Sequence, residues 1–347
     1  MRIAMICAAL VAALNLAPAG AAHAGAKYKI AAQTRAVKYG SYYPVALTDY
    51  GLAAGTLYGY TGDNSAYFSD GKYFSDDGFC QILGESGGTE LTGISRDSEL
   101  TYTAGQCTTQ NAGYVYNGTT NVTTAVQYPG ANLTIVSGVS NAGRVGGYYY
   151  DASGTVHGFY FDSSTYTSFD PPGSTYTEVR GIAPNGTLSG LYTDATGLSH
   201  GFMVNAAGIY TTIDYPGAKY TVVTQVNSQN LAAGTIEFPN GAEQSFAWRS
   251  GSFLLPPLPS NTYSQATAVS EAGIVVGTYG IAPPNVNGGF VWNPATSKLI
   301  VVKAPAGATY LDVRTVNSTH AQIAGSYYNA ANKEVGYIAT CKGTKCF

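Results

Sequence analysis

The sequence predicts an all-β fold, namely a seven-bladed β-propeller built of four-stranded antiparallel blades. Three observations predict it: a repeat of nearly constant length, a glycine and an aromatic residue at fixed places in that repeat, and a strand-and-turn composition. The chain of 347 residues contains 43 glycines and 29 tyrosines. Glycine serves tight turns and tyrosine is favoured in strands. After residue 25 the sequence has no sustained helical periodicity.

The repeat is marked by an apolar anchor residue that recurs every 43 to 47 residues. The seven anchors are Leu47, Ile94, Val139, Ile182, Val226, Val269 and Val316. A period near 45 residues is typical of a propeller blade with four short strands. The predicted repeat units are 41–87, 88–132, 133–175, 176–219, 220–262, 263–309 and 310–341.

Two further residue types keep their place within the units. A glycine follows the anchor by eight residues in five units and slightly later in the other two: Gly55, Gly147, Gly190, Gly234 and Gly277, then Gly105 and Gly325. An aromatic residue follows the anchor by 20 or 21 residues in all seven: Tyr67, Tyr114, Phe159, Phe202, Phe246, Phe290 and Tyr337. This constancy indicates that each unit folds in the same way.

The fourth unit shows how one blade is built. Its predicted strands are TEVRGIA (177–183), TLSGLYT (187–193), SHGFMV (199–204) and IYTTIDY (209–215). The turns between them carry Asn185-Gly186, Asp194 with Gly197, and Gly208, and a final Pro-Gly closes the unit. Such turns supply the positive φ angles that tight hairpins need.

The two ends of the chain predict how the ring closes. The last unit stops after three strands, at VGYIATC (335–341), while KYKIAA (27–32) resembles the missing fourth strand. We therefore expect residues 27–35 to supply a closing strand, with residues 27–33 paired to the strand around Gly336–Thr340. Such a closure leaves no open sheet edge.

The first 24 residues have the pattern of a secretory signal peptide, which predicts a secreted or periplasmic protein. Residues 25–347 then form a single domain, with no membrane span, and we expect a monomer because ring closure needs no partner. Four cysteines remain: Cys80, Cys107, Cys341 and Cys346. Proximity favours the disulfides Cys80–Cys107 and Cys341–Cys346, although four cysteines allow three pairings.

Units three and four carry the segments HGFYF and HGFMV, preceded by VSGVSNAGRVGGYYYD and VRGIAPNGTLSGLYTD and followed by YTTIDYPGA in unit four. These segments resemble the HAF repeat family, bacterial extracellular repeat proteins named for a His-Ala-Phe motif. Here glycine replaces the alanine, and only two of the seven units keep the histidine. The resemblance implies an exported repeat protein and brings no established reaction or ligand.

His157 and His200 stand at equivalent places in adjacent units, eighteen residues after their anchors. A catalytic histidine is expected once, whereas these two recur with the repeat. We interpret them as structural residues that hydrogen-bond Asp151 and Asp194, and we assign no catalytic residue. A net charge of −3, with only 11 % charged residues, argues against nucleic acid as a partner.

Departures from the repeat on the innermost strand mark the candidate binding site. Glu178 with Arg180, and Asp312 with Arg314, place an acid and an arginine on one strand face in units four and seven. The two pairs are expected nearly opposite each other across the central channel. They could line a site for a carboxylate, a sugar or ordered water; the alternative is salt bridges that only stabilise the blades.

Two other groups of residues are candidate ligand sites. Asp63, Asp70, Asp76 and Asp77 offer hard oxygen ligands, so calcium is the one cofactor that the sequence suggests, but they lack the spacing of an EF-hand loop. Tyrosines gather on the second strands, at Tyr148, Tyr149, Tyr150, Tyr192, Tyr279, Tyr327 and Tyr328. Blade packing is one interpretation of them, and stacking on sugar rings is the other.

These observations favour an exported binding or scaffold module that recognises a glycan or a surface protein at the channel or rim. Two alternatives stay open. One is a lyase or hydrolase that works in the channel, and the other is a purely structural protein of the envelope or matrix. Fold alone does not decide between them.

Overall fold

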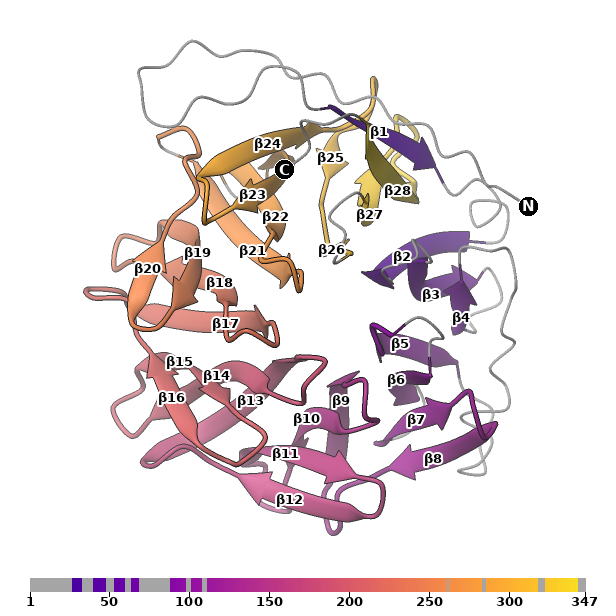
Figure 1. Cartoon of the computed structure of the whole chain (residues 1–347), viewed down its shortest axis with the longest axis vertical. Coiled ribbons are helices and arrows are strands. Elements are labelled where there is room, and N and C mark those ends of the chain that lie inside the picture. The colour runs from indigo at the N-terminus through magenta and orange to yellow at the C-terminus, as the bar shows by residue number, and fades with distance from the viewer. Residues whose placement is uncertain are drawn as a thin grey trace.

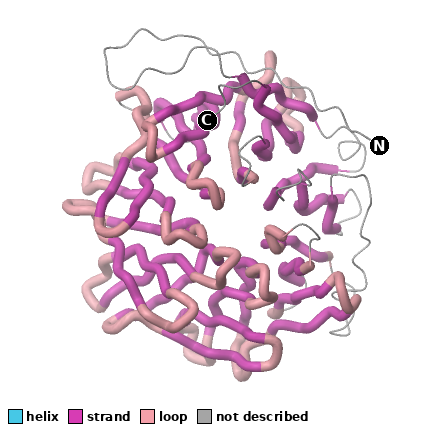
Figure 2. Tube along the Cα trace, in the orientation of Figure 1, coloured by secondary structure: helices cyan, strands magenta, loops and turns pink. Residues whose placement is uncertain are grey.

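The computed structural model describes residues 27–32, 40–47, 53–59, 64–68, 88–97, 101–107, 111–260, 262–282, 285–317 and 322–342. Every regular element in these ranges is a β-strand, and the strands form sheets arranged in a ring (Figure 1). Figure 2 shows the same ring as strands joined by loops. No described segment is a helix long and apolar enough to cross a membrane.

The first half of the ring contains three antiparallel sheets. The first is β2 (Gly40–Leu47), β3 (Ala53–Gly59) and β4 (Asn64–Phe68). The second is β5 (Thr89–Ile94), β6 (Tyr102–Cys107), β7 (Gly113–Asn117) and β8 (Val122–Val126). The third is β9 (Leu133–Val139), β10 (Val145–Tyr150), β11 (Val156–Asp162) and β12 (Thr165–Phe169).

An eight-stranded sheet follows. Its first four strands are β13 (Ser174–Ile182), β14 (Leu188–Asp194), β15 (Ser199–Val204) and β16 (Tyr210–Ile213). Its other four are β17 (Tyr220–Val226), β18 (Ala232–Glu237), β19 (Glu243–Arg249) and β20 (Ser252–Leu254). The two halves are joined only by a parallel pairing of Ser199 with Tyr220.

Two sheets complete the ring. One is β21 (Tyr263–Val269), β22 (Val275–Ala282), β23 (Asn285–Asn293) and β24 (Lys298–Lys303). The last joins β25 (Tyr310–Leu311), β26 (Thr315–Val316), β27 (Gln322–Tyr328) and β28 (Glu334–Lys342) to β1 (Lys27–Ala32).

The all-β, propeller-like arrangement that the sequence predicts is confirmed, but seven separate four-stranded blades are not found. Of the six sheets, four are separate units of four or five strands, one has three described strands and one has eight. The physical reason for the large sheet is the contact between β15 and β17, where two units approach closely enough to pair. In the last sheet the innermost strand is split into β25 and β26.

The ring is closed by the N-terminal strand, as predicted. β1 pairs antiparallel with β28, with Ile30 opposite Ala339 and Ala32 opposite Tyr337. A strand from the start of the chain thus covers the edge of the last sheet, and hydrogen bonds satisfy backbone groups that would otherwise be exposed.

The repeat has a direct structural meaning. All seven anchors are the last residues of innermost strands: β2, β5, β9, β13, β17, β21 and β26. The phased glycine lies opposite the phased aromatic on the next strand, as Gly190 lies opposite Phe202. A Cβ on Gly190 would collide with the carbonyl oxygen of Glu178, because the register shifts between Val179 and Gly181. The glycine is therefore required by the close approach of two backbones.

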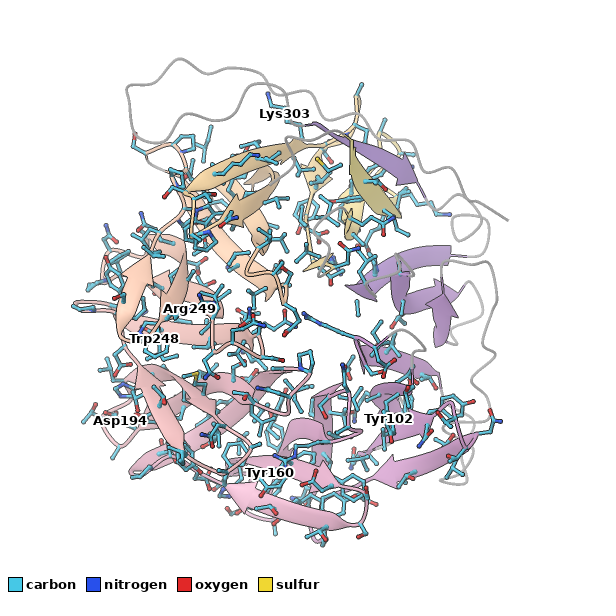
Figure 3. The ribbon with its side chains drawn as sticks, in the orientation of Figure 1. Tyr102, Tyr160, Asp194, Trp248, Arg249 and Lys303 are labelled. Atoms are coloured by element: carbon cyan, nitrogen blue, oxygen red, sulfur yellow. The ribbon has the colours of Figure 1, made fainter. Side chains whose placement is uncertain are left out.

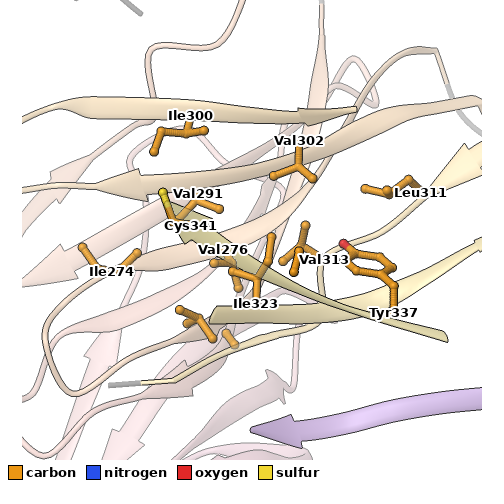
Figure 4. Packing of buried hydrophobic residues seen from close by; sticks show 13 residues of the cluster. Ile274, Val276, Val291, Ile300, Val302, Leu311, Val313, Ile323, Tyr337 and Cys341 are labelled. Carbon is orange, nitrogen blue, oxygen red and sulfur yellow. The ribbon is translucent and has the colours of Figure 1, made fainter. Parts of the chain in front are cut away.

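The core lies between neighbouring sheets rather than in one central layer. Figure 4 shows one such cluster, in which Val276 and Val291 from one sheet pack with Ile323 and Tyr337 from the next. All four side chains are fully buried. Burial of a side chain of this size contributes about 1.5–3 kcal/mol, so contacts between blades hold the ring together.

Several predictions fall outside the described residues: the signal peptide (1–24), the four aspartates considered for calcium, and two of the cysteines, Cys80 and Cys346. Cys107 and Cys341 are described, and both are buried and disulfide-bonded. The pairing of the cysteines therefore stays a prediction.

Candidate functional site

A central cavity of about 160 Å³ lies where the innermost strands meet. Every repeat unit contributes to its lining, from Ala46 in the first to Thr315 in the last. The residue two positions before the anchor lines it in units two to seven: Thr92, Ser137, Arg180, Thr224, Thr267 and Arg314. This is the position that the sequence analysis assigned to the channel.

Hydroxyl side chains at this position form hydrogen bonds between neighbouring units. Ser137 Oγ donates to the carbonyl oxygen of Val179 at 2.5 Å, and Thr267 Oγ1 donates to that of Val313 at 2.6 Å. Each bond joins one innermost strand to that of the next unit. Arg180 and Arg314 depart from this pattern, so two positions in the lining carry a guanidinium instead of a hydroxyl.

Arg180 projects into the cavity with most of its donors unused. Its Nε lies 3.0 Å from Glu178 Oε1, and 39 % of its side chain is exposed. Neither Nη group has a hydrogen-bond partner among the described residues, although both can donate. Glu178 is held in turn by the hydroxyl of Tyr176, which donates to its Oε2 at 2.7 Å.

Arg314 is bound much more tightly. Its Nε lies 2.6 Å from Asp312 Oδ2, and its Nη2 lies 3.2 Å from Ser326 Oγ and 3.4 Å from Glu334 Oε1. Only 16 % of the side chain is exposed. Ser326 also donates from its backbone N–H to Asp312 Oδ1 at 2.6 Å. Two carboxyl groups and a hydroxyl thus fix this guanidinium in place.

Burial shifts both members of this pair. Burial is the main cause that raises the pKa of the Asp312 carboxyl to about 7; the N–H of Ser326 acts against this shift and the charge of Glu334 contributes to it. Burial also lowers the pKa of Arg314 to about 10. Asp312 does not line the cavity, so we interpret it as a residue that positions Arg314.

Arg96 completes the cationic lining and was missed by sequence reasoning. It stands two residues after its anchor, and its Nη1 donates to the carbonyl oxygen of Val269 at 3.0 Å. That bond joins units two and six across the ring. Its backbone N–H donates to Asn141 Oδ1 at 2.7 Å. The residue at this position varies from unit to unit, so the repeat gives no signal for Arg96.

The lining as a whole is cationic and polar. Three arginines contribute to it, and no aspartate or glutamate is found among the described residues that line it. Glu178 pairs with Arg180 and Asp312 pairs with Arg314, and neither carboxylate is among the described lining residues, although the sequence predicts both in the channel lining. A cavity of this kind favours a negatively charged group, because a guanidinium presents several donors in a plane that matches a carboxylate or phosphate.

The two repeated histidines lie apart from this cavity. His157 Nδ1 is 2.7 Å from Asp170 Oδ2 and its Nε2 is 3.5 Å from Asp151. His200 has the same arrangement, at 2.9 Å from Asp214 and 3.3 Å from Asp194. In Figure 3, Asp194 lies at the outer part of the ring.

The predicted contacts with Asp151 and Asp194 are present, while Asp170 and Asp214 were not foreseen. Burial alone lowers the pKa of His157, but the hydrogen bond and charge of Asp170, followed by those of Asp151, outweigh it and raise the pKa overall. The same balance raises the pKa of His200. No group of three or more potential metal ligands is found in the described part of the chain.

The second-strand tyrosines divide between two environments. Tyr149 is buried and stacks on Tyr128, with ring centroids 3.7 Å apart, and Tyr192 is buried beside His200. These two pack within and between blades. Tyr148 and Tyr150 stay half-buried on the face of β10 that also faces Glu178.

No protein-family model matches the chain, and no curated protein matches it. Solved structures are similar in fold. The β-propeller domain of the Trilobed protease from Pyrococcus furiosus is 8 % identical with a TM-score of 0.59, over 86 % of this chain and 95 % of that domain. The Myceliophteria thermophila Cps50 (Swd1) β-propeller domain is 9 % identical with a TM-score of 0.52, over 86 % and 96 %.

A puromycin hydrolase is 12 % identical with a TM-score of 0.57, over 86 % of this chain. The aligned part covers 51 % of the hydrolase, so this chain spans about half of its length. At such identities the likeness establishes the propeller fold and leaves the activity open.

Proposed function

We propose that this chain is an exported propeller module that binds the carboxylate, or another oxyanion, of a ligand in its central cavity. The observation that carries the proposal is Arg180, whose guanidinium lines the cavity with both Nη groups unpartnered among the described residues. Its Nε is held by Glu178. The side chain is therefore oriented before a ligand arrives, which lowers the cost of binding.

The rest of the lining supports an anionic ligand. Arg314 adds a second guanidinium, fixed by Asp312 and Glu334, and Arg96 adds a third. Hydroxyls surround them, and the described lining has no carboxylate to repel an anion. A volume of about 160 Å³ suits one charged end group rather than a whole macromolecule.

Catalysis is the competing function, as a lyase or hydrolase in the same channel. The described lining contains no carboxyl, imidazole or thiol that would serve as acid, base or nucleophile. Ser137, its one serine, already donates to a neighbouring carbonyl. This composition favours binding over chemistry.

The proposal also covers the number of blades, the repeat family and the export of the chain. Counting each half of the eight-stranded sheet as one blade makes the ring seven-bladed, in keeping with seven anchors that each end an innermost strand. The HGF segments support membership of the HAF repeat family, and the leader sequence supports export. A module that recognises a surface glycan or protein fits both.

Isothermal titration calorimetry of the mature protein with galacturonate and with galactose tests this function. The two sugars differ in one carboxylate, so we expect saturable binding of galacturonate only, and its loss in Arg180→Ala. Equal binding of both sugars, or unchanged galacturonate binding in the variant, would refute the oxyanion site. A structural role predicts no binding of either.

A further inference from the structure

Four consecutive innermost strands carry a tyrosine at the same place, six residues before the anchor. They are Tyr176 on β13, Tyr220 on β17, Tyr263 on β21 and Tyr310 on β25. The first three units have Ser41, Gly88 and Leu133 at that place. All four tyrosines are half-buried. We call them the tyrosine arc, since they follow one side of the ring.

The tyrosine arc shares a strand face with the cationic cavity. On β13, Tyr176, Glu178 and Arg180 are accessible while Thr177 and Val179 between them are buried. Successive residues of a strand alternate between faces, so the accessible three form one row. Tyr176 and Arg180 are four residues apart, which is about 13 Å along a strand. A short chain of sugar residues spans this distance.

Neighbouring members of the arc lie within electrostatic reach of each other and of the cavity residues. Burial is the main cause that raises the pKa of Tyr310, followed by the charge of Asp312 and then by the nearby Tyr263. Burial also raises the pKa of Tyr220, on which the charges of Arg180 and Glu178 from the preceding unit act as well.

The hydroxyls of the arc are available. Those of Tyr220, Tyr263 and Tyr310 have no hydrogen-bond partner among the described residues, and only that of Tyr176 is engaged, with Glu178. Tyrosines that serve packing are different: Tyr337 is fully buried and donates to the carbonyl oxygen of Asp312. Half-exposed rings with unpartnered hydroxyls offer an apolar face and a polar edge together.

Amide and carboxylate groups lie between the tyrosines. Gln265 is exposed on β21, between Tyr263 and Thr267, and its Nε2 donates to Glu243 Oε2 at 2.7 Å. Sugar rings need this combination, because their C–H faces pack on aromatic rings while their hydroxyls hydrogen-bond to polar side chains.

We infer that the ligand is an acidic oligosaccharide, whose carboxylate is bound by Arg180 and whose following sugar rings lie over the tyrosine arc. This inference rests on the proposed oxyanion site and names its ligand class. The arginine selects the charge, and the arc supplies additional contacts for each further ring.

Titration calorimetry with a galacturonic acid tetramer, its monomer and maltotetraose tests the inference. We expect the acidic tetramer to bind at least about tenfold more tightly than the monomer, as one or two ring contacts would provide. Maltotetraose, which lacks the carboxylate, should bind much more weakly. Tyr220→Ala should reduce tetramer affinity by about tenfold and reduce monomer affinity much less.

Tyr210→Ala is the matched control, since Tyr210 is half-buried on the outermost strand β16, away from the channel. Its tetramer affinity should equal that of the unmodified protein. Tyr263→Ala provides a second arc variant should Tyr220→Ala unfold. If the monomer binds through Arg180 but the tetramer gains nothing, the arc is wrong while the oxyanion site stands. If neither acid binds, the proposed function itself is wrong, and a protein ligand becomes the next candidate.

Discussion

Arg180 and Arg314 reach the same cavity from equivalent positions, but Arg180 is paired with one carboxylate and 39 % exposed, whereas Arg314 is enclosed by two and 16 % exposed. The two arginines therefore have the same backbone position in their units but different neighbouring side chains. In our proposal Arg180 binds the ligand, whereas Arg314 shapes the cavity. This difference gives the first prediction.

Replacing Arg314 with alanine should destabilise the protein by about 3–5 kcal/mol, because the buried Asp312 and Glu334 would lose their counter-charge. Arg180→Ala should change the free energy of unfolding by less than about 1 kcal/mol, since exposed ion pairs contribute little. Urea unfolding measures both. Asp312→Asn in the Arg314→Ala background should recover part of the lost stability. A double variant that is no more stable than Arg314→Ala alone would contradict the charge explanation.

The two histidines should make stability depend on pH. Their folded-state pKa values are raised above the unfolded value of about 6.5, so the folded protein holds the protons more tightly. The resulting stabilisation is fully present below about pH 6.5 and is lost as pH rises through the folded pKa. Urea unfolding across this range should show stability falling toward high pH.

The double variant His157→Gln and His200→Gln should remove that component of the pH dependence. Glutamine retains a hydrogen-bonding side chain but does not titrate in this range. An identical pH profile in the variant would show that other groups cause the slope.

Gly190→Ala tests the close approach of the first two strands of a blade. A Cβ at Gly190 would collide with the carbonyl oxygen of Glu178, so we expect a loss of about 3 kcal/mol or more, comparable with overpacking of a core. Gly197→Ala is the control, because its Cβ would meet no atom and only its positive φ is unfavourable, which costs about 1–2 kcal/mol. Equal losses in the two variants would contradict the proposed collision.

Removal of β1 tests the closure of the ring. A chain that starts at residue 34 lacks the partner of β28 and exposes an edge between Glu334 and Lys342. Such an edge promotes association, so we expect a lower unfolding temperature and dimers or larger species in size-exclusion chromatography. A truncated chain that stays monomeric and equally stable would show that the pairing contributes little.

The sequence predicted the periodic part of this molecule well. All seven anchors end innermost strands, and the phased glycine and aromatic face each other, because such positions have the same local environment in each unit. The closing strand was also predicted, since its segment resembles the one missing at the other end. Residues 180 and 314 were placed in the channel by phase alone.

Contacts between units were not predictable in the same way. Arg96 donates a hydrogen bond to Val269 across the ring, and β15 pairs with β17 where two neighbouring units approach each other. Neither contact lies within one repeat unit. The histidine partners Asp170 and Asp214 directly follow the fourth strands β12 and β16, and only the folded hairpin brings them near the histidines on the third strands. The tyrosine arc does have a sequence signal, because tyrosine recurs six residues before the anchor in four consecutive units.

A crystal structure of the mature protein soaked with galacturonate tests the central claim most directly. The account predicts a carboxylate in the central cavity, within hydrogen-bond distance of the Nη groups of Arg180. Galacturonate bound elsewhere on the ring, or an empty cavity at a concentration that saturates the protein in solution, would contradict it.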